Sequence, residues 1–209
     1  SNQKKLSENI NVGKYISGYK SSSVRLKRLR HFINSFGNVN DEAYGLLLQE
    51  LSTTLDGEMY MELVKSSIIV PNEQHEERIN NEKKRRLNEA ESLLSTAKSS
   101  TNMESIRRGH MEIGDIYYEF GVYDEALKSY QRTRDYFGKN EHNYECYIKS
   151  AICNLSQKQY SLGEYSLAKI DIPLTPIMEL QCNVLKGYFS LCNGKFHQAA
   201  KIFIDIDGV

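Results

Sequence analysis

Apolar side chains between residues 102 and 137 recur at the spacing of an α-helix, in two stripes. Gly121 and Val122 separate the stripes. Two amphipathic segments joined by so short a turn predict a pair of antiparallel helices. The positions that form the two stripes are Ile106, Gly109, Ile113, Tyr117, Phe120, Tyr123, Ala126, Leu127 and Tyr130.

A small residue, a second small residue and a large apolar residue recur along the chain with spacings of 12 and 4. The complete sets are Gly114, Ala126, Tyr130 and Gly187, Ala199, Phe203, and a weaker set between them is Ala151, Gly163, Leu167. Successive sets are 37 and 36 residues apart, close to the period of about 34 residues of a tetratricopeptide repeat. We therefore predict an all-α fold, a tetratricopeptide-like helical-repeat solenoid of antiparallel helix pairs with a right-handed superhelix.

Two glycines, Gly109 and Gly114, lie inside the first predicted helix of the hairpin. Each costs roughly 1 kcal/mol of helix propensity relative to alanine, so we expect a neighbouring helix to approach closely there. The residues to which we assign repeat packing are Gly109, Gly114, Tyr117, Ala126, Tyr130, Gly187, Ala199 and Phe203.

The N-terminal third has the pattern of three short helices. We expect the first to begin at Ser22 or Ser23 as its N-cap and to end at Gly37 and Asn38. The second is expected to begin at Asp41, and the third to follow Gly57 and to end at Pro71. Before them, a polar lead-in is expected to dock through its few apolar residues, Tyr15, Ile16 and Tyr19.

The segment 72–100 starts as a charged stretch and becomes amphipathic, which predicts one long helix. The predicted organisation is therefore an N-terminal segment at 1–71, a connecting helix at 72–101 and about three repeats at 102–209. The last helix is expected from Lys195 to about Ile204. Its apolar end lacks the polar cap that a solenoid requires, so we expect the natural chain to continue.

Composition limits the classes of function. The formal net charge is zero, which argues against a dedicated nucleic-acid-binding domain. There is no apolar signal region at the start and no run of roughly 18 apolar residues, so no membrane contact is expected. The four cysteines have no C-x-x-C spacing and are expected to be reduced, mostly buried thiols.

Two basic clusters each have more than one interpretation. The helix face with Arg25, Arg28 and Arg30 is either a contact for an acidic partner or a solvated surface. The run at 83–86 is either a nuclear import signal, a phosphate-contacting patch or another solvated face.

No catalytic motif is present. The phosphate-binding glycine loops, the H-E-x-x-H zinc motif and the G-x-S-x-G elbow are all missing, and the five histidines are scattered. We therefore predict no catalytic, cofactor-binding or metal-binding residues and no cofactor.

The segment ESIRRGH at 104–110, followed by Gly114, Asp115 and RTRDYF at 132–137, resembles one family. It is similar to subunit one of the COP-nine signalosome, whose sister family is subunit seven of the proteasome lid. The RLKRLRHFI run at 25–33 and the ending at 187–204 are similar to the same family in order and spacing.

This resemblance implies a non-catalytic scaffold within the complex that removes the ubiquitin-like modifier from cullins, with the zinc metalloprotease in another subunit. The family's winged-helix PCI domain is expected beyond residue 209. Other signalosome subunits, and cullin-RING ligase components, would be partners, in nucleus and cytoplasm. Arg107 and Arg108 are further candidates for partner contact. The alternatives are the equivalent arm of the proteasome lid and a helical-repeat module that binds nucleic acid.

Overall fold

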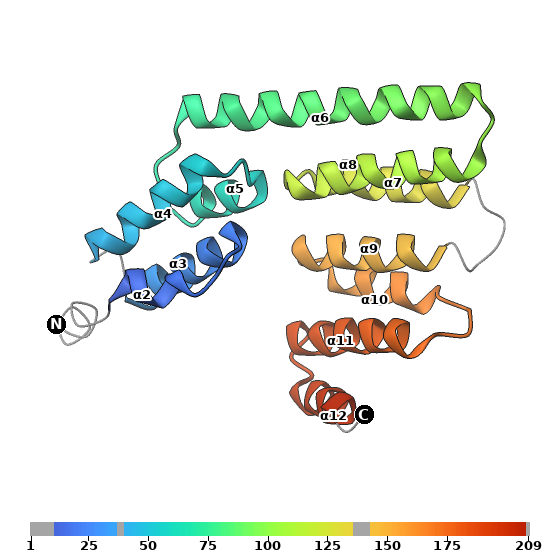
Figure 1. Ribbon diagram of the computed structural model, residues 1–209. Coiled ribbons are helices and arrows are strands. Elements are labelled where there is room, and N and C mark those ends of the chain that lie inside the picture. The colour runs from blue at the N-terminus through green and yellow to red at the C-terminus, as the bar shows by residue number, and fades with distance from the viewer. Residues whose placement is uncertain (1–10, 37–39, 136–142, 208–209) are drawn as a thin grey trace. The chain divides into compact units, whose positions relative to one another are not determined.

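The computed structural model describes residues 11–36, 40–135 and 143–207, which form eleven α-helices and contain no strand (Figure 1). The helices pack as adjacent pairs, so the predicted all-α helical-repeat fold is confirmed. In order, they are α2 (Val12–Ser17), α3 (Ser22–Phe36), α4 (Asp41–Thr53), α5 (Gly57–Lys65), α6 (Glu73–Ser99), α7 (Met103–Glu119), α8 (Tyr123–Asp135), α9 (Asn143–Ser156), α10 (Tyr160–Ala168), α11 (Pro176–Cys192) and α12 (Phe196–Asp207).

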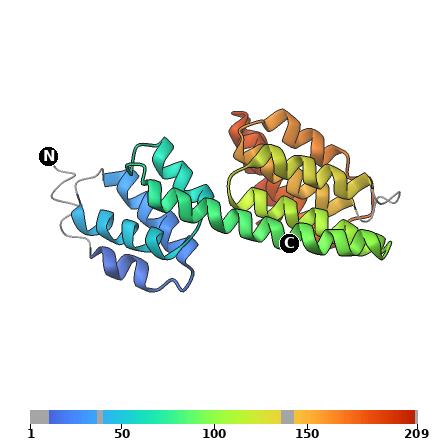
Figure 2. The same ribbon diagram turned by 90° about the horizontal axis from the view of Figure 1, so that it is seen from above.

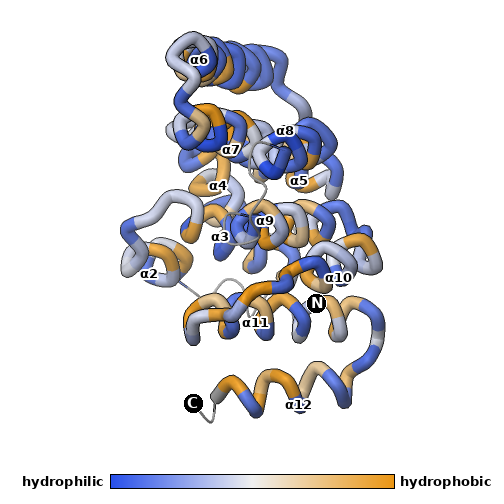
Figure 3. The backbone as a smooth tube through the Cα atoms, turned by 90° about the vertical axis from the view of Figure 1, so that its right-hand side faces the viewer, coloured by the Kyte–Doolittle hydropathy of each residue, from blue (hydrophilic) through white to orange (hydrophobic). Residues whose placement is uncertain are grey.

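The chain divides into two compact units. The first contains the described residues up to Arg85 together with Glu119–Gly121, and the second contains Arg86–Tyr118 and the described residues from Val122 onward. The division falls inside α6, the long helix expected at 72–100, so this helix contributes its N-terminal half to one unit and its C-terminal half to the other. Figure 3 shows that most of α6 is hydrophilic.

Side-chain caps define the helix starts in the first unit. Asn11, Asn40 and Asp56 each accept a hydrogen bond from the backbone amide three residues later, which satisfies one of the free donors at a helix start. The apolar faces of α3, α4 and α5 then form the core. Its fully buried side chains include Leu26, Leu29, Leu47 and Leu63.

The docking of the lead-in agrees with expectation, whereas the end of the third helix needs correction. The lead-in contains a short helix, α2, in which Ile16 is buried and the Tyr15 ring lies 6.0 Å from that of Phe32. The third helix ends at Lys65 rather than near Pro71. Ser67 adopts a left-handed conformation with φ 56°, and the chain turns there. The predicted end of the first helix at Gly37 and Asn38 lies outside the described residues.

The second unit stacks helix hairpins in chain order. Figures 1 and 2 show α7 to α11 lying alongside one another, and α12 packs on α11. The predicted turn after α7 is present. The last helix begins one residue after the predicted Lys195 and continues beyond Ile204 to Asp207. Thr175 caps α11 and Pro176 occupies its first turn.

The three turns within the repeats share one backbone geometry. Gly121, Lys158 and Gly194 stand at equivalent positions with φ 70°, 61° and 73°. The next residue's amide donates in each case to the carbonyl five residues before it, at 2.8 Å. This is the bond of a Schellman motif, which closes a helix C-terminus. The middle turn achieves it with lysine in a conformation that favours glycine.

Glycines in the first and third repeats lie against aromatic rings of the following helix. A Cβ atom on Gly114 would lie 2.4 Å from the Tyr130 ring, and one on Gly187 would lie 2.5 Å from the Phe203 ring. The alanines of these two sets, Ala126 and Ala199, are fully buried.

Gly109 has a different neighbour: a Cβ there would meet Leu94 of α6 at 3.0 Å. Close approach of a helix therefore explains both internal glycines of α7. It occurs from α8 at Gly114 and from α6 at Gly109.

The middle repeat uses its glycine differently. Gly163 lies on α10, and a Cβ there would come within 2.2 Å of the ring of Phe189 on α11. Phe189 is completely buried, in a cluster with Ala151, Leu167 and Leu185. The glycine of this repeat thus accepts a ring from the following repeat.

All four cysteines are free thiols. Three of them, Cys146, Cys153 and Cys182, are buried, whereas Cys192 is exposed. None of the helices in the described part of the chain is long and apolar enough to cross a membrane.

Candidate interaction site

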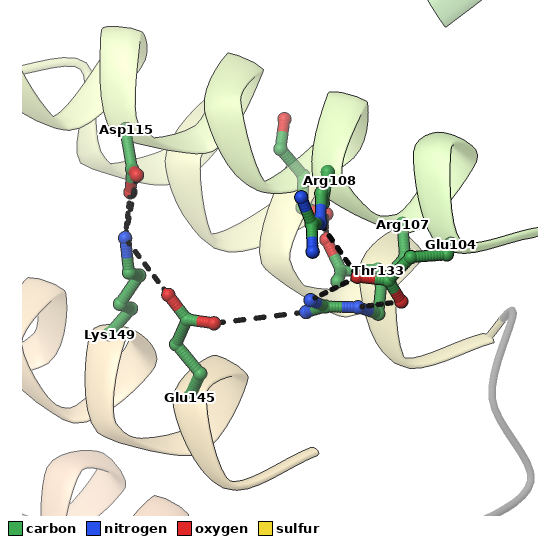
Figure 4. Close-up of polar contacts among 8 residues, drawn as sticks. Glu104, Arg107, Arg108, Asp115, Thr133, Glu145 and Lys149 are labelled. Carbon is green, nitrogen blue, oxygen red and sulfur yellow. Dashed lines mark hydrogen bonds and ion pairs between the residues drawn. The ribbon is translucent and has the colours of Figure 1, made fainter. Parts of the chain in front are cut away.

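A chain of ion pairs joins the first two repeats along the edges of α7 and α9 (Figure 4). Glu104, in the first turn of α7, accepts hydrogen bonds from Arg107 and from Arg108, one turn later. The Arg107 guanidinium also reaches Glu145 on α9 at 3.7 Å. Arg107 therefore pairs with acidic side chains of both repeats.

The chain continues at Lys149, one turn beyond Glu145 on α9. Its ammonium group lies 2.6 Å from the Asp115 carboxylate on α7 and 3.7 Å from Glu145. The hydroxyl of Tyr130 donates to the same Asp115 carboxylate at 2.8 Å. Asp115 therefore connects the Tyr130 ring, which packs against Gly114, to Lys149 of the next repeat.

These contacts shift two proton equilibria. Hydrogen bonds from Arg107 and Arg108 lower the pKa of Glu104 to about 2. Burial, followed by the negative charge of Asp115, raises the pKa of Tyr130 well above its ordinary value. At neutral pH Glu104 is ionised and Tyr130 is a neutral donor, as the observed hydrogen bonds require.

A groove of about 360 Å³ lies between α6, α7 and α8, all within the second unit. Three cationic and two anionic side chains line it, together with His110 and Tyr117. His110 is almost completely buried. Burial, then the charges of Lys98 and Arg132, lower the pKa of His110, so its imidazole is neutral at pH 7. The charged lining residues are Glu91, Lys98, Glu125, Lys128 and Arg132.

Comparison of the sequence with known proteins shows which family the chain belongs to. The sequence model described as 26S proteasome subunit RPN7 matches residues 72–208, which include α6 and all of the repeats. The chain belongs to the RPN7 family. The match covers both the ion-pair chain and the groove, whereas helices α2 to α5 lie outside it.

Two curated relatives of this RPN7-family chain are signalosome subunits. COP9 signalosome complex subunit 1 of Arabidopsis thaliana is 28% identical over 120 residues, which are 56% of the chain and 27% of the relative. COP9 signalosome complex subunit 1b of Drosophila melanogaster is 42% identical over 57 residues, which are 27% of the chain and 11% of the relative. The matched regions thus span less than a third of either relative. The resemblance to the signalosome subunit and its lid sister is confirmed.

The two arginines predicted to contact partners differ in placement. The Arg107 side chain is 12% exposed and lies between the repeats, whereas Arg108 is 75% exposed and pairs with Glu104 of its own helix (Figure 4). Arg107 therefore stabilises repeat stacking, and Arg108 presents its charge to solvent. A partner contact by either arginine stays a prediction.

The three arginines of α3 all have partners within the first unit. Arg25 pairs with Glu50 at 2.6 Å and donates to two backbone carbonyls before α3. Arg28 lies over the rings of Tyr15 and Tyr19, at 4.1 and 4.3 Å from their centroids. The third, Arg30, forms an ion pair with Glu62 of α5. These contacts give each a structural role, and partner binding by them stays a prediction.

Sequence reasoning missed the groove. Its cations come from α6 and α8, separated by more than 30 positions along the chain, and no motif spacing connects them. Only the stacking of three helices brings Lys98, His110 and Arg132 together. Across the described ranges, no cluster of three or more His, Cys, Asp or Glu residues could hold a metal ion.

Proposed function

We propose that this chain is a non-catalytic interaction arm of a signalosome-like complex, which removes the ubiquitin-like modifier from cullins and so regulates cullin-RING ubiquitin ligases. The similarity to signalosome subunit 1 in a plant and an insect carries the proposal. In this role the chain supplies binding surface, and the metalloprotease step belongs to another subunit.

The architecture of the second unit suits such a role. Stacked helix hairpins present extended surfaces that bind proteins, and each repeat contacts mainly its neighbours. The charged edge holds the first two repeats together through Arg107 and Lys149, while Arg108 extends its charge outward. A stacked array with a charged, exposed edge provides contacts without needing a catalytic cleft.

Partners and location belong to the same proposal. A PCI domain following residue 209 would supply the main contacts with sister subunits, and the arm would remain available to cullin-RING ligase components. Residence in nucleus and cytoplasm follows from that assignment, with the basic run at 83–86 as the candidate import signal.

The alternative is the equivalent arm of the proteasome lid, which the family description itself favours, because it names a 26S proteasome subunit. Purifying the tagged full-length protein from its own cells separates the two. We expect the co-purifying subunits, identified by mass spectrometry, to be those of the signalosome. Recovery of lid subunits without signalosome subunits would overturn the first proposal in favour of the second.

A nucleic-acid-binding role has less support, because Arg25, Arg28 and Arg30 already have partners in their own unit. A salt titration tests it directly. Phosphate contacts release counterions and must give steeply salt-dependent binding, so we expect no measurable binding of duplex or single-stranded DNA or RNA even at low salt.

A further inference from the structure

The groove between α6, α7 and α8 contains positive charge that its own surroundings do not neutralise. Lys128 is paired with Glu125 at 2.6 Å. Lys98 and Arg132 line the same groove from opposite helices, and within the described residues neither forms an ion pair or a hydrogen bond. Two cations that face one hollow without an ion-pair partner among the described residues are an attractive position for an anion.

The charges are sorted along the groove. Lys98, His110 and Arg132 all line the groove, and each lies seven residues, about two turns, from Glu91, Tyr117 and Glu125 respectively on its own helix. Because α7 runs antiparallel to α6 and to α8, Lys98 and Arg132 lie at the His110 end of the groove, whereas Glu91 and Glu125 lie at the Tyr117 end. One half of the groove is therefore cationic, and the other half has an aromatic wall with carboxylates.

We propose that this groove binds an extended segment of a partner protein and that one acidic side chain of the segment is held between Lys98 and Arg132. The groove volume of about 360 Å³ suits a few side chains in extended conformation. The ring of Tyr117 offers apolar contact area.

The charge of the lining selects a carboxylate over a more highly charged group. Three cations and two carboxylates leave one net positive charge, because His110 is neutral. A single aspartate or glutamate side chain balances this charge. A phosphorylated residue or a nucleic-acid backbone would bring further negative charge towards Glu91 and Glu125, which would repel it.

The inference rests on the proposed role as an interaction arm, and it names the chemistry of one partner segment. It does not depend on whether the assembled complex is the signalosome or the proteasome lid. Binding in the groove and assembly with sister subunits are measured separately, so either can fail without the other.

The probe is a displayed library of random linear peptides of about twelve residues, selected on the immobilised 209-residue chain. We expect the enriched peptides to share an acidic residue. The affinity of a synthetic representative, measured by fluorescence anisotropy, should fall about tenfold when its acidic residue becomes the amide, because a charge-assisted hydrogen bond is lost.

Four protein variants locate the site. Lys98→Gln and Arg132→Gln should each weaken the same peptide about tenfold, and Glu91→Gln should strengthen it severalfold, because a repelling carboxylate is removed. Lys186→Gln, on an exposed position of α11 outside the groove, is the matched control and should leave affinity unchanged. All four positions are surface side chains, and thermal melts establish that each variant is folded.

Three outcomes would overturn the inference: no peptide enriched, enriched peptides without an acidic residue, or binding that is indifferent to Lys98→Gln and Arg132→Gln. Tighter binding of the same peptide with phosphoserine replacing its acidic residue would instead assign the groove to phosphorylated partners. The proposed function fails separately, if the affinity-purified protein lacks signalosome subunits while the peptide still binds.

Discussion

In the first and third repeats, a glycine on the leading helix faces an aromatic ring on the following helix of the same repeat. In the middle repeat, the glycine stands on the following helix, and the ring, that of Phe189, belongs to the next repeat. The same close contact therefore closes a hairpin at Gly114 and at Gly187, and joins two hairpins at Gly163.

The two junctions of the array differ accordingly. Between the first and middle repeats, the contacts include the ion pairs of Arg107 with Glu145 and of Lys149 with Asp115. Between the middle and third repeats, a fully buried ring enters a glycine notch. The first junction also packs Cys146 and Cys153 of α9 against Ala126 and Tyr130 of α8. The two junctions therefore differ in what each adds to an apolar core: ion pairs at the first and a buried ring at the second.

The largest effect is expected from Phe189→Ala. Removing a completely buried phenylalanine typically costs about 3–5 kcal/mol of unfolding free energy. Here it also removes the ring that packs against Gly163 of the middle repeat. Tyr188→Ala, at the adjacent but 49% exposed ring, is the control and should cost about 1 kcal/mol. Chemical denaturation measures both, and equal losses would show that the ring does not hold the junction.

Adding a side chain to the glycines that face aromatic rings should have the next largest effect on the unfolding free energy. Gly163→Ala and Gly114→Ala should each lower the unfolding free energy by about 1–2 kcal/mol, because overpacking exceeds the gain in helix propensity. Gly45→Ala is the control: it lies inside α4 with nothing within 4 Å of the added atom. That variant should be more stable by up to about 1 kcal/mol. Stabilisation of all three variants would contradict the close contacts.

The turns provide a smaller test. Gly194→Ala places a side chain in a left-handed conformation in open space and should cost about 1 kcal/mol. Lys158→Gly, at the equivalent middle turn, should stabilise by about 0.5 kcal/mol, since the relief of strain slightly exceeds the added entropy of the unfolded chain. Thermal unfolding of the two variants should therefore shift in opposite directions. A shift in the same direction would argue against equivalent turns.

Substitutions of the neighbouring Arg107 and Arg108 distinguish a contact between repeats from a charge exposed to solvent. Arg107→Gln should destabilise by about 1 kcal/mol, because the Arg107 side chain, itself 12% exposed, loses its bonds to Glu104 on its own helix and its ion pair with half-exposed Glu145 of the next repeat. Arg108→Gln, at 75% exposure, should change stability by less than about 0.5 kcal/mol. Urea unfolding at two salt concentrations checks this prediction, and only the Arg107 contribution should be largely retained at high salt. Equal effects would remove Arg107 from the junction.

The smallest effect concerns acid. The pKa of Glu104 is lowered from 4.5 to about 2 in the folded chain, so its stabilising contribution is complete above the ordinary value. The contribution is lost as the pH falls from 4.5 towards 2. Because Glu104 is half-exposed, roughly 0.5 kcal/mol or less is involved. Glu104→Gln should flatten the pH dependence of stability in that range, and an unchanged slope would contradict the shift.

Spacing along the chain predicted the first and third repeats because each aromatic ring lies 16 residues after its glycine, within one hairpin. The middle repeat gave a weak pattern because its ring, Phe189, lies 26 residues after Gly163, in a different repeat. The sequence therefore predicts contacts inside a hairpin well. It cannot assign contacts between hairpins before their stacking is known.

The same limit applies to the candidate site. Arg107 and Arg108 are adjacent and chemically identical, and only the position of α9 decides which of them lies between the repeats. The groove likewise depends on where α6 and α8 lie beside α7. Helix faces and caps are local properties, whereas the choice among exposed cations depends on tertiary contacts.

The hydrogen-bonded turns after α7, α9 and α11 also bear on the order of folding. Each closes its helix through a bond spanning five residues, so the entropy lost on forming it is small. The first and third hairpins can therefore form early, from contacts local in sequence. The middle hairpin acquires its buried ring only when α11 arrives, and we expect its amides to gain protection from hydrogen exchange last during refolding.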